Sequence, residues 1–248
     1  MFRLLCCCCV PSDNLNERQP LLQPVSSAAI NGAESARQAP SAHNDVQTVK
    51  RIGKLMMRRV NVTDLDLRFN DMAESFNEQQ KHYEAMVEHI RKLKQISGST
   101  NVDNLAFAEC IGKIRIEHES TYRVSLKMKG YDFSLVTNPI GPEGENEEKP
   151  LCLQSAQSEV MGLSDRAKAT ISKGTALIQL IDWLLRGHSQ MAEQVKGAAE
   201  NYQEEGRLCD NLEENMKEVR RAKELSQRYR QQAGEVYNEA AQIAGIGI

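Results

Sequence analysis

Residues 65–93 read LDLRFNDMAESFNEQQKHYEAMVEHIRKL, and this stretch decides the fold. Apolar side chains recur in it at alternating spacings of four and three residues, which places them on one stripe of an α-helix. The stripe holds Leu65, Phe69, Met72, Phe76, Gln79, Tyr83, Met86, Ile90 and Leu93, and only Gln79 is polar. The pattern predicts a long helix packed against a partner helix. Thr63 and Asp66 resemble a capping box at its start, and Ser97-Gly98-Ser99 predicts its end.

A second helical pattern begins near Gln154 and continues almost to the end of the chain. The same spacing runs from Leu177 to Val219, and the register then slips by about one residue before Leu225. Three glycines could bend such a helix: Gly187, Gly197 and Gly206. Unbroken, it would extend about 130 Å, which is more than the earlier helix can cover. We therefore expect its stripe to meet another chain, a membrane or a fold-back partner.

The intervening residues, 101–137, are ambiguous. A helical stripe contains Phe107, Ile111, Ile114, His118 and Tyr122. From Tyr122 to Met128, however, apolar and polar residues alternate, and Lys129-Gly130 could turn the chain into a second alternating run. We favour a second helix that continues to about Lys129 and runs antiparallel to the first. A small β-hairpin near 121–137 is the alternative, and residues 138–150 are expected to form an exposed loop.

These patterns predict an all-α fold, an elongated helical bundle or coiled coil over residues 49–248. Composition agrees, because 5% of the residues are aromatic and 26% are charged, as is typical of long helices. Residues 23–48 are rich in Ala, Ser, Gln and Pro and predict a disordered linker. Residues 1–22 are expected to act as a lipid-anchor and sorting segment.

The lipid-anchor prediction rests on four consecutive cysteines, Cys6, Cys7, Cys8 and Cys9. Exposed cysteines beside apolar and basic residues are typical of S-palmitoylation, and several acyl chains hold a protein on a membrane more stably than one. A metal site would need cysteine pairs spaced along the chain, which this sequence lacks. A cleaved signal peptide and redox or metal chemistry remain the alternatives, and Phe2 excludes myristoylation.

Glu17, Leu21 and Leu22 follow this cluster in the order Glu-x-x-x-Leu-Leu. The six residues resemble the acidic dileucine signal that clathrin adaptors bind in cytosolic tails. In such a signal the leucines fill an apolar pocket and the acid meets a basic patch. The resemblance implies sorting to late endosomes or lysosomes. An ordinary apolar pair in a disordered tail is the alternative.

A basic cluster lies where the predicted linker ends. It contains Lys50, Arg51, Lys54, Arg58 and Arg59, interleaved with Ile52, Leu55, Met56 and Val60. Residues 1–63 hold eight Lys or Arg and four Asp or Glu, whereas the whole chain has a net charge of −3. The cluster predicts either an amphipathic helix on anionic lipid or the first turns of the bundle with a solvated basic face. Aromatic residues and further basic clusters are missing, so we expect no nucleic-acid binding.

No sequence motif for nucleotide binding, nucleophilic catalysis or metal-dependent catalysis occurs, and we expect neither an enzyme nor a cofactor or metal site. His82 and His89 are expected to be exposed helix residues. Core positions are expected for His188 and for Trp183, with an interface or a lipid contact as the alternatives for Trp183. The isolated cysteines, Cys110, Cys152 and Cys209, show no activating neighbours in the sequence.

Together these expectations describe a non-enzymatic, lipid-anchored adaptor on the cytosolic face of late endosomes or lysosomes, with the Golgi and the plasma membrane as alternative locations. Its partners would be the membrane, through palmitoyl chains and anionic lipid, clathrin adaptors, and other helical proteins or a second copy of itself. The alternative function is membrane remodelling or fusion by a BAR-like or SNARE-like helical protein.

Overall fold

The structure is a computed structural model that describes residues 53–99, 107–141 and 149–246. Contacts divide the chain into two units, Met1–Asn44 and Asp45–Ile248, and all described residues belong to the second. The predicted acylation cluster Cys6–Cys9, the sorting residues Glu17, Leu21 and Leu22, and the basic residues Lys50 and Arg51 lie outside the described ranges.

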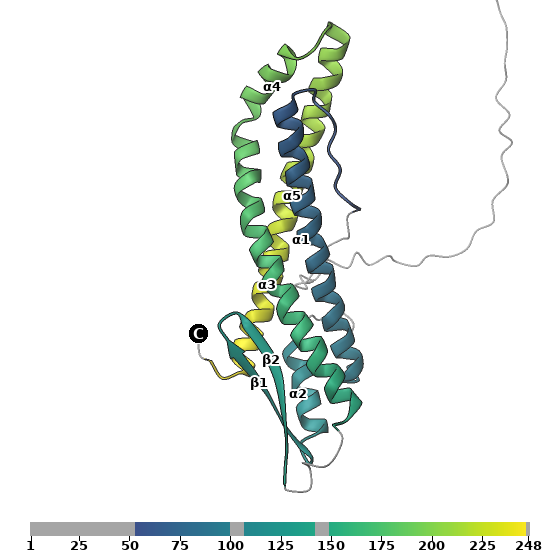
Figure 1. The fold of residues 1–248 in the computed structure, drawn as a ribbon, viewed down its shortest axis with the longest axis vertical. Helices are drawn as coiled ribbons and strands as arrows, with labels where there is room; N and C mark the ends of the chain where they lie inside the picture. The colour runs from purple at the N-terminus through teal and green to yellow at the C-terminus, as the bar shows by residue number, and fades with distance from the viewer. Residues whose placement is uncertain (1–52, 100–106, 142–148, 247–248) are drawn as a thin grey trace, which may run out of the picture. The chain divides into compact units, whose positions relative to one another are not determined.

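The described residues form five helices and one two-stranded sheet, so the predicted all-α fold is confirmed together with its small hairpin. The elements are α1 (Thr63–Ile96), α2 (Phe107–Glu117), β1 (Tyr122–Lys129), β2 (Asp132–Pro139), α3 (Leu151–Arg186), α4 (His188–Gly197) and α5 (Tyr202–Ile243). The long helices α1, α3 and α5 pack side by side, with α3 antiparallel to the other two (Figure 1). Helix α4 lies at one end of this bundle, and α2 and the hairpin lie at the other.

The stripe from Leu65 to Leu93 forms the buried face of α1. All nine of its residues are buried, Gln79 included. The helix ends at Ile96, as predicted, and Gly98 supplies the positive φ of 61° that follows it. The predicted capping box does not form, because Val62 is the N-cap residue and no side chain caps the helix there. Asp66 Oδ1 instead accepts a hydrogen bond from the Val60 N–H at 2.8 Å.

The second helical pattern folds back on itself rather than forming one rod. A break at Gly187 separates α3 from α4, and residues 198–201 separate α4 from α5. Gly206 lies inside α5 and does not interrupt it. The predicted slip is visible in the buried stripe of α5, where Met216, Val219 and Ala222 follow one another at spacings of three. The fold-back brings the stripes of α3 and α5 together inside one chain.

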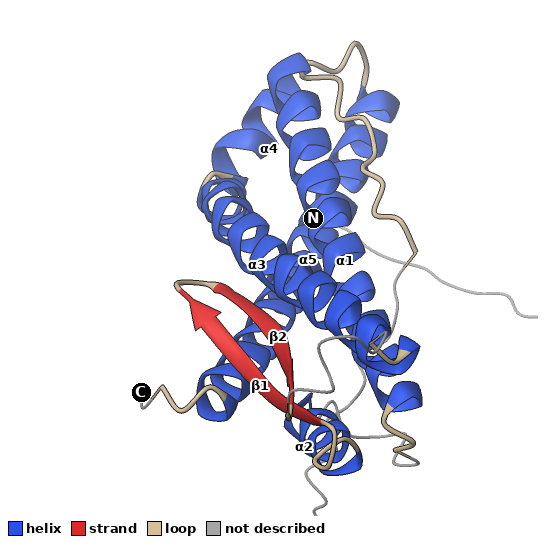
Figure 2. Cartoon of the chain, turned by 60° about the horizontal axis from the view of Figure 1, so that its bottom comes forward, coloured by secondary structure: helices blue, strands red, loops and turns tan. Residues whose placement is uncertain are grey.

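Residues 122–139 form a hairpin, so the favoured helix through Lys129 is wrong and the alternative is confirmed. Gly130, with φ at 62°, is the first central residue of the two-residue turn. An isolated hairpin is marginal in water, but this one lays its apolar face on α2, α3 and α5 (Figure 2). The Phe133 ring centroid lies 5.6 Å from those of Phe107 and Tyr237. Packing against distant helices therefore decides between helix and strand here.

Gln79 belongs to a buried polar layer in the middle of the bundle. Its Nε2 donates to the backbone oxygens of Thr170 at 3.2 Å and Ser226 at 3.4 Å, on α3 and α5. Gly174 makes room for it, since a Cβ at that position would lie 2.3 Å from Gln79 Nε2 and 2.5 Å from Arg230 Cδ. A polar group at one core position specifies which turns of the helices face one another.

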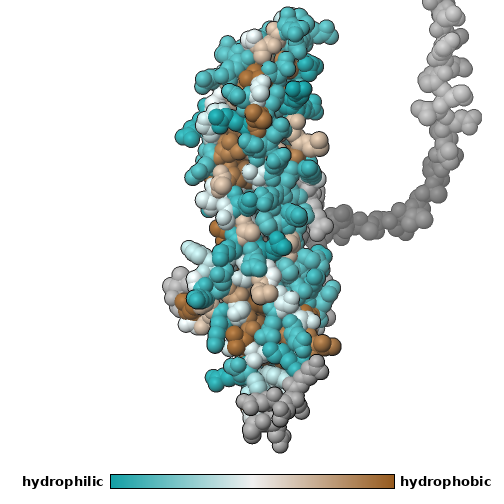
Figure 3. All heavy atoms as spheres, viewed as in Figure 1, coloured by the Kyte–Doolittle hydropathy of each residue, from teal (hydrophilic) through white to brown (hydrophobic). Residues whose placement is uncertain are grey.

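The face of the described bundle drawn in Figure 3 is mainly hydrophilic, with apolar side chains in separate places. The large exposed apolar residues come from several elements and include Met56, Leu67, Ile116, Tyr131 and Trp183. No helix within the described ranges combines the length and apolar character needed to cross a lipid bilayer.

Candidate functional site

Residues 53–62, here called the N-terminal arm, lead into α1 and carry the described part of the predicted basic cluster. No residue from 53 to 62 is helical, so for this stretch the predicted amphipathic helix and its alternative, the first turns of the bundle, are both wrong. The backbone of the arm is hydrogen-bonded to side chains of both α1 and α5. Asn61, with φ at 62°, provides the left-handed residue at which the chain reverses into α1.

Three asparagines hold the arm in place. Asn77 of α1 accepts from the Leu55 N–H at 2.8 Å and donates to the Leu55 oxygen at 2.9 Å. Asn215 of α5 makes the same pair of bonds with Arg58, both at 2.8 Å, and Asn211 Nδ2 donates to the Arg59 oxygen at 2.8 Å. A side-chain amide carries one acceptor and two donors, so it can bond to a peptide group as a neighbouring strand would. The arm thus has partners for its backbone without joining a sheet.

Burial of two side chains explains why the arm is extended. Leu55 and Val60 are 8% and 0% exposed, and both belong to the main core, whereas Met56 is 78% exposed. The bonds to Asn77 and Asp66 fix residues 55 and 60 beside points eleven residues apart on α1. Five extended residues and eleven helical residues both span roughly 16 Å, so only an extended arm reaches both contacts.

The basic side chains of the arm point away from the core. Lys54, Arg58 and Arg59 are exposed and form no ion pair with another described residue. Acidic residues of α5 lie nearby, since Glu214 and Glu218 line a cavity of about 370 Å³ together with Lys54 and Arg58. The hydrogen bond from Lys217 lowers the pKa of Glu214, and Arg58 lowers it further. The arm is therefore basic but partly compensated by α5.

His82 and His89 have structural roles that the sequence did not predict. His89 is partly buried, and its Nδ1 lies 2.6 Å from Glu159 Oε2. A Cβ on Gly162 would lie 2.4 Å from the His89 ring, so this glycine lets α1 and α3 approach. His82 is also partly buried, with burial and then Arg166 lowering its pKa. The prediction that His82 and His89 are exposed is wrong.

The two predicted core residues near the end of α3 are nearer the surface. Trp183 is 39% exposed, and the Arg68 guanidinium lies 4.2 Å from its ring centroid. A cation over the face of an indole is attracted to its π electrons, which favours this surface position. His188 is half-buried, with Nε2 2.8 Å from Glu213 Oε1.

Cys152 has a neighbour that no sequence pattern indicates. It is exposed in the first turn of α3, and its Sγ lies 3.4 Å from His118 Nε2. The two residues are 34 positions apart, so only the fold brings them together. Cys110 is buried, and burial raises its thiol pKa. Within the described residues, no group of three or more His, Cys, Asp or Glu side chains is arranged to hold a metal ion.

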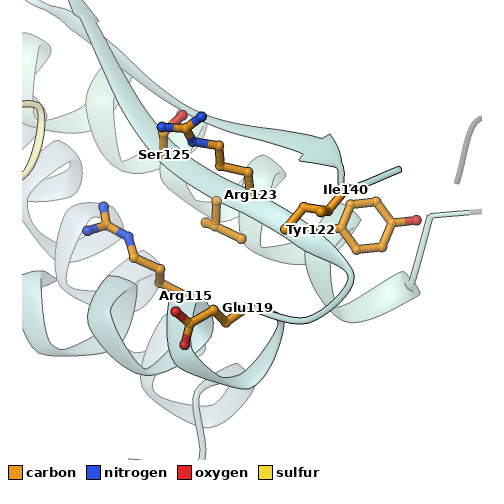
Figure 4. Close-up of a pocket in the computed structure, with 7 residues that line it drawn as sticks. Arg115, Glu119, Tyr122, Arg123, Ser125 and Ile140 are labelled. Carbon is orange, nitrogen blue, oxygen red and sulfur yellow. The ribbon is translucent and has the colours of Figure 1, made fainter. Parts of the chain in front are cut away.

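A second cavity, of about 520 Å³, lies between β1 and α2. Its lining consists of Arg115, Glu119, Tyr122, Arg123, Val124, Ser125 and Ile140. Figure 4 shows Arg115 on α2 and Glu119 in the turn after it, near the strand that carries Arg123 and Ser125. This cavity contains none of the predicted site residues.

Comparison of the chain with known protein families, with curated proteins and with solved structures finds no match.

Proposed function

We propose that this protein is a non-enzymatic adaptor that palmitoyl chains on Cys6–Cys9 hold on the cytosolic face of late endosomes or lysosomes. In this proposal Glu17, Leu21 and Leu22 are read by clathrin adaptors during sorting, and the helical bundle binds partner proteins. Support for the anchor and the sorting signal comes from the sequence. Support for the way they are joined to the bundle comes from the arm.

The observation that carries the proposal is the attachment of the arm to two helices. The five bonds from Asn77, Asn211 and Asn215 fix residues 55–59 to α1 and α5. A tail acylated near its start would therefore pull on a defined place on the bundle, not on a frayed helix end. This arrangement suits a protein that must present a fixed surface to partners while its anchor stays in the bilayer.

The exposed cations of the arm would assist the lipid anchor. A basic side chain close to an anionic cytosolic leaflet contributes about 1 kcal/mol of binding free energy. Arg59 would supply most of this contribution, because Lys54 and Arg58 line a cavity together with acidic residues of α5. Such a contribution is small beside that of several acyl chains, so the arm would orient the bundle more than it would retain it.

Replacing Cys6, Cys7, Cys8 and Cys9 with serine tests the proposal directly. Release of the full chain from membranes into the cytosol is expected, measured by fractionation of cells and by imaging. Replacement of Cys152 and Cys209 with serine is the matched control and should leave the protein on membranes. Unchanged membrane retention of the four-serine variant would contradict the anchor.

The sorting signal has its own experiment. Leu21→Ala combined with Leu22→Ala should leave the protein on membranes but move it from lysosomes to the cell surface or Golgi. Pro20→Ala, which leaves the acid and both leucines in place, is the control. Lysosomal localisation of the double variant would contradict this part of the proposal.

The remodelling alternative is separated by adding purified full chain to liposomes and examining their shape. Tubulation would favour the alternative, and binding without deformation favours the adaptor. One observation weighs against a SNARE-like assembly: Gln79, the polar core position such an assembly would share among chains, is bonded to α3 and α5 of its own chain.

A further inference from the structure

The two edges of the hairpin differ in their hydrogen bonding. On β2, the Phe133 N–H donates to Ser164 Oγ at 3.0 Å, and the Leu135 oxygen accepts from Gln157 Nε2 at 2.9 Å. Both partners belong to α3, so this helix covers the outer edge of β2. The backbone N–H and C=O groups of Phe133 and Leu135 therefore point away from β1.

The pairing register of β1 and β2 shows which backbone groups lie on the outer edge of β1. Met128 lies opposite Phe133, and Leu126 lies opposite Leu135. Opposed residues of an antiparallel pair either exchange both hydrogen bonds or exchange none, in alternation along the strands. Met128, Leu126 and, by the same alternation, Val124 thus point their N–H groups away from β2. None of these three donors has a hydrogen-bond partner within the described part of the chain.

The cavity of about 520 Å³ lies along this open edge. Tyr122 and Val124 point their side chains toward the core, whereas Arg123 and Ser125 lie on the opposite face of β1. Residues from both faces line the cavity, which places it at the edge of the strand. Arg115 of α2 and Glu119 of the following turn form its other wall (Figure 4). An additional extended chain would enter between this wall and β1.

The charges around the open edge are mostly positive. Arg115 belongs to α2, and Arg123, Lys127 and Lys129 follow along the exposed face of β1. All four are exposed and form no ion pair with another described residue, while Glu119 is the one acid in the cavity lining. Cations on an edge strand discourage pairing between identical copies, since each copy would bring the same charges. An acidic strand would meet complementary charges instead.

We propose that the open edge of β1 is a docking site for an extended acidic segment of a partner protein, which adds to the hairpin as a third strand. The segment's backbone pairs with the free groups of Val124, Leu126 and Met128. Its acidic side chains lie beside Arg123 and Lys127 on the exposed face, and its alternate apolar side chains enter the cavity between β1 and α2. The site lies on the described bundle and not on the tail with the proposed acylation sites. The docking proposal can therefore be tested independently of the membrane anchor.

Two synthetic peptides test this site on the full chain kept under reducing conditions. One alternates valine with glutamate, and the other alternates valine with lysine. The glutamate peptide is expected to bind, as measured by fluorescence anisotropy, and the lysine peptide is not. Equal binding of both peptides, or binding of neither, would overturn the proposal.

Amide hydrogen exchange followed by NMR distinguishes strand addition from loose attraction of charges. Without peptide, the amides of Arg123, Ser125 and Lys127 should exchange slowly because they bond to β2, and those of Val124 and Leu126 should exchange fast. The glutamate peptide should slow Val124 and Leu126 by about tenfold or more. Protection of these two amides before peptide is added would mean that the edge is already covered, and would also overturn the proposal.

Charge reversal supplies the matched pair of variants. Arg115→Glu with Arg123→Glu should weaken binding of the glutamate peptide by about tenfold, because two attractions become repulsions. Arg220→Glu with Arg228→Glu makes the same change in net charge at exposed positions of α5 and should leave binding unchanged. Equal losses in the two double variants would show non-specific attraction and reject the site, and circular dichroism establishes that both remain folded.

Discussion

Two extended segments pack against the same helical bundle, and they combine apolar burial and hydrogen bonds from helix side chains in different proportions. The hairpin bonds its strands to each other and attaches to the helices mainly through buried apolar side chains such as Phe133. The N-terminal arm has no partner strand, and side-chain amides of α1 and α5 bond directly to its backbone. The hairpin therefore depends mainly on apolar burial, with two side chains of α3 bonding to the outer edge of β2. The arm buries only Leu55 and Val60 in the core and depends more on polar side chains at fixed places. Substitutions should separate these two modes of attachment.

The largest effect is expected at the hairpin. Phe133→Ala removes a ring that is 2% exposed and lies between Phe107 and Tyr237. Loss of a buried phenylalanine costs about 3–5 kcal/mol in the free energy of unfolding. Denaturant unfolding followed by circular dichroism measures it. Ser134→Ala, at an exposed neighbouring position, is the control and should change the free energy by less than about 0.5 kcal/mol. Similar values for the two variants would mean that the hairpin is not anchored by its apolar face.

A smaller and local effect is expected at the arm. Asn215→Ala leaves the backbone N–H and oxygen of Arg58 without their partner, which weakens local attachment by about 1–3 kcal/mol. Trypsin should then cleave after Arg58 and Arg59 faster, as followed by mass spectrometry. Asn211→Ala removes one bond instead of two and should have a smaller effect. An unchanged cleavage rate in Asn215→Ala would mean that the asparagines do not hold the arm.

A third effect depends on pH and concerns the core that both segments cover. Burial raises the pKa of Tyr83 and of Tyr229 to about 12. Because the folded pKa exceeds the unfolded value of about 10, these residues stabilise the fold fully below pH 10, and the stabilisation is lost as the pH rises toward 12. The free energy of unfolding should fall across that window. Tyr229→Phe should make the fall shallower, and an identical slope would contradict the assignment. Asparagine amides do not titrate, so the bonds that hold the arm should contribute nothing to this slope.

The candidate sites depend on contacts between distant residues, which the sequence alone could not predict. The basic residues of the arm could be named from composition, but their conformation could not. The residues that hold the arm, Asn77 and Asn215, lie 22 and 157 positions away from the backbone groups they bond. Glu239 makes the same point, because it accepts a hydrogen bond from the Ala108 N–H at the start of α2, 131 positions away. Burial raises the pKa of this carboxylate, and no local pattern indicates either fact.

Local residue patterns were sufficient to predict the helical class, the buried stripe of α1 and the end of that helix at Ile96. These features are local, because apolar spacing sets the buried face and a glycine that accepts a positive φ ends the helix. Three other features depend on contacts between distant segments. Residues 122–139 form strands, the arm is extended, and the second helical pattern folds back. In each case two local conformations are compatible with the same residues. The two conformations differ less in local free energy than the protein gains by burial against distant helices. Packing therefore determines which conformation forms.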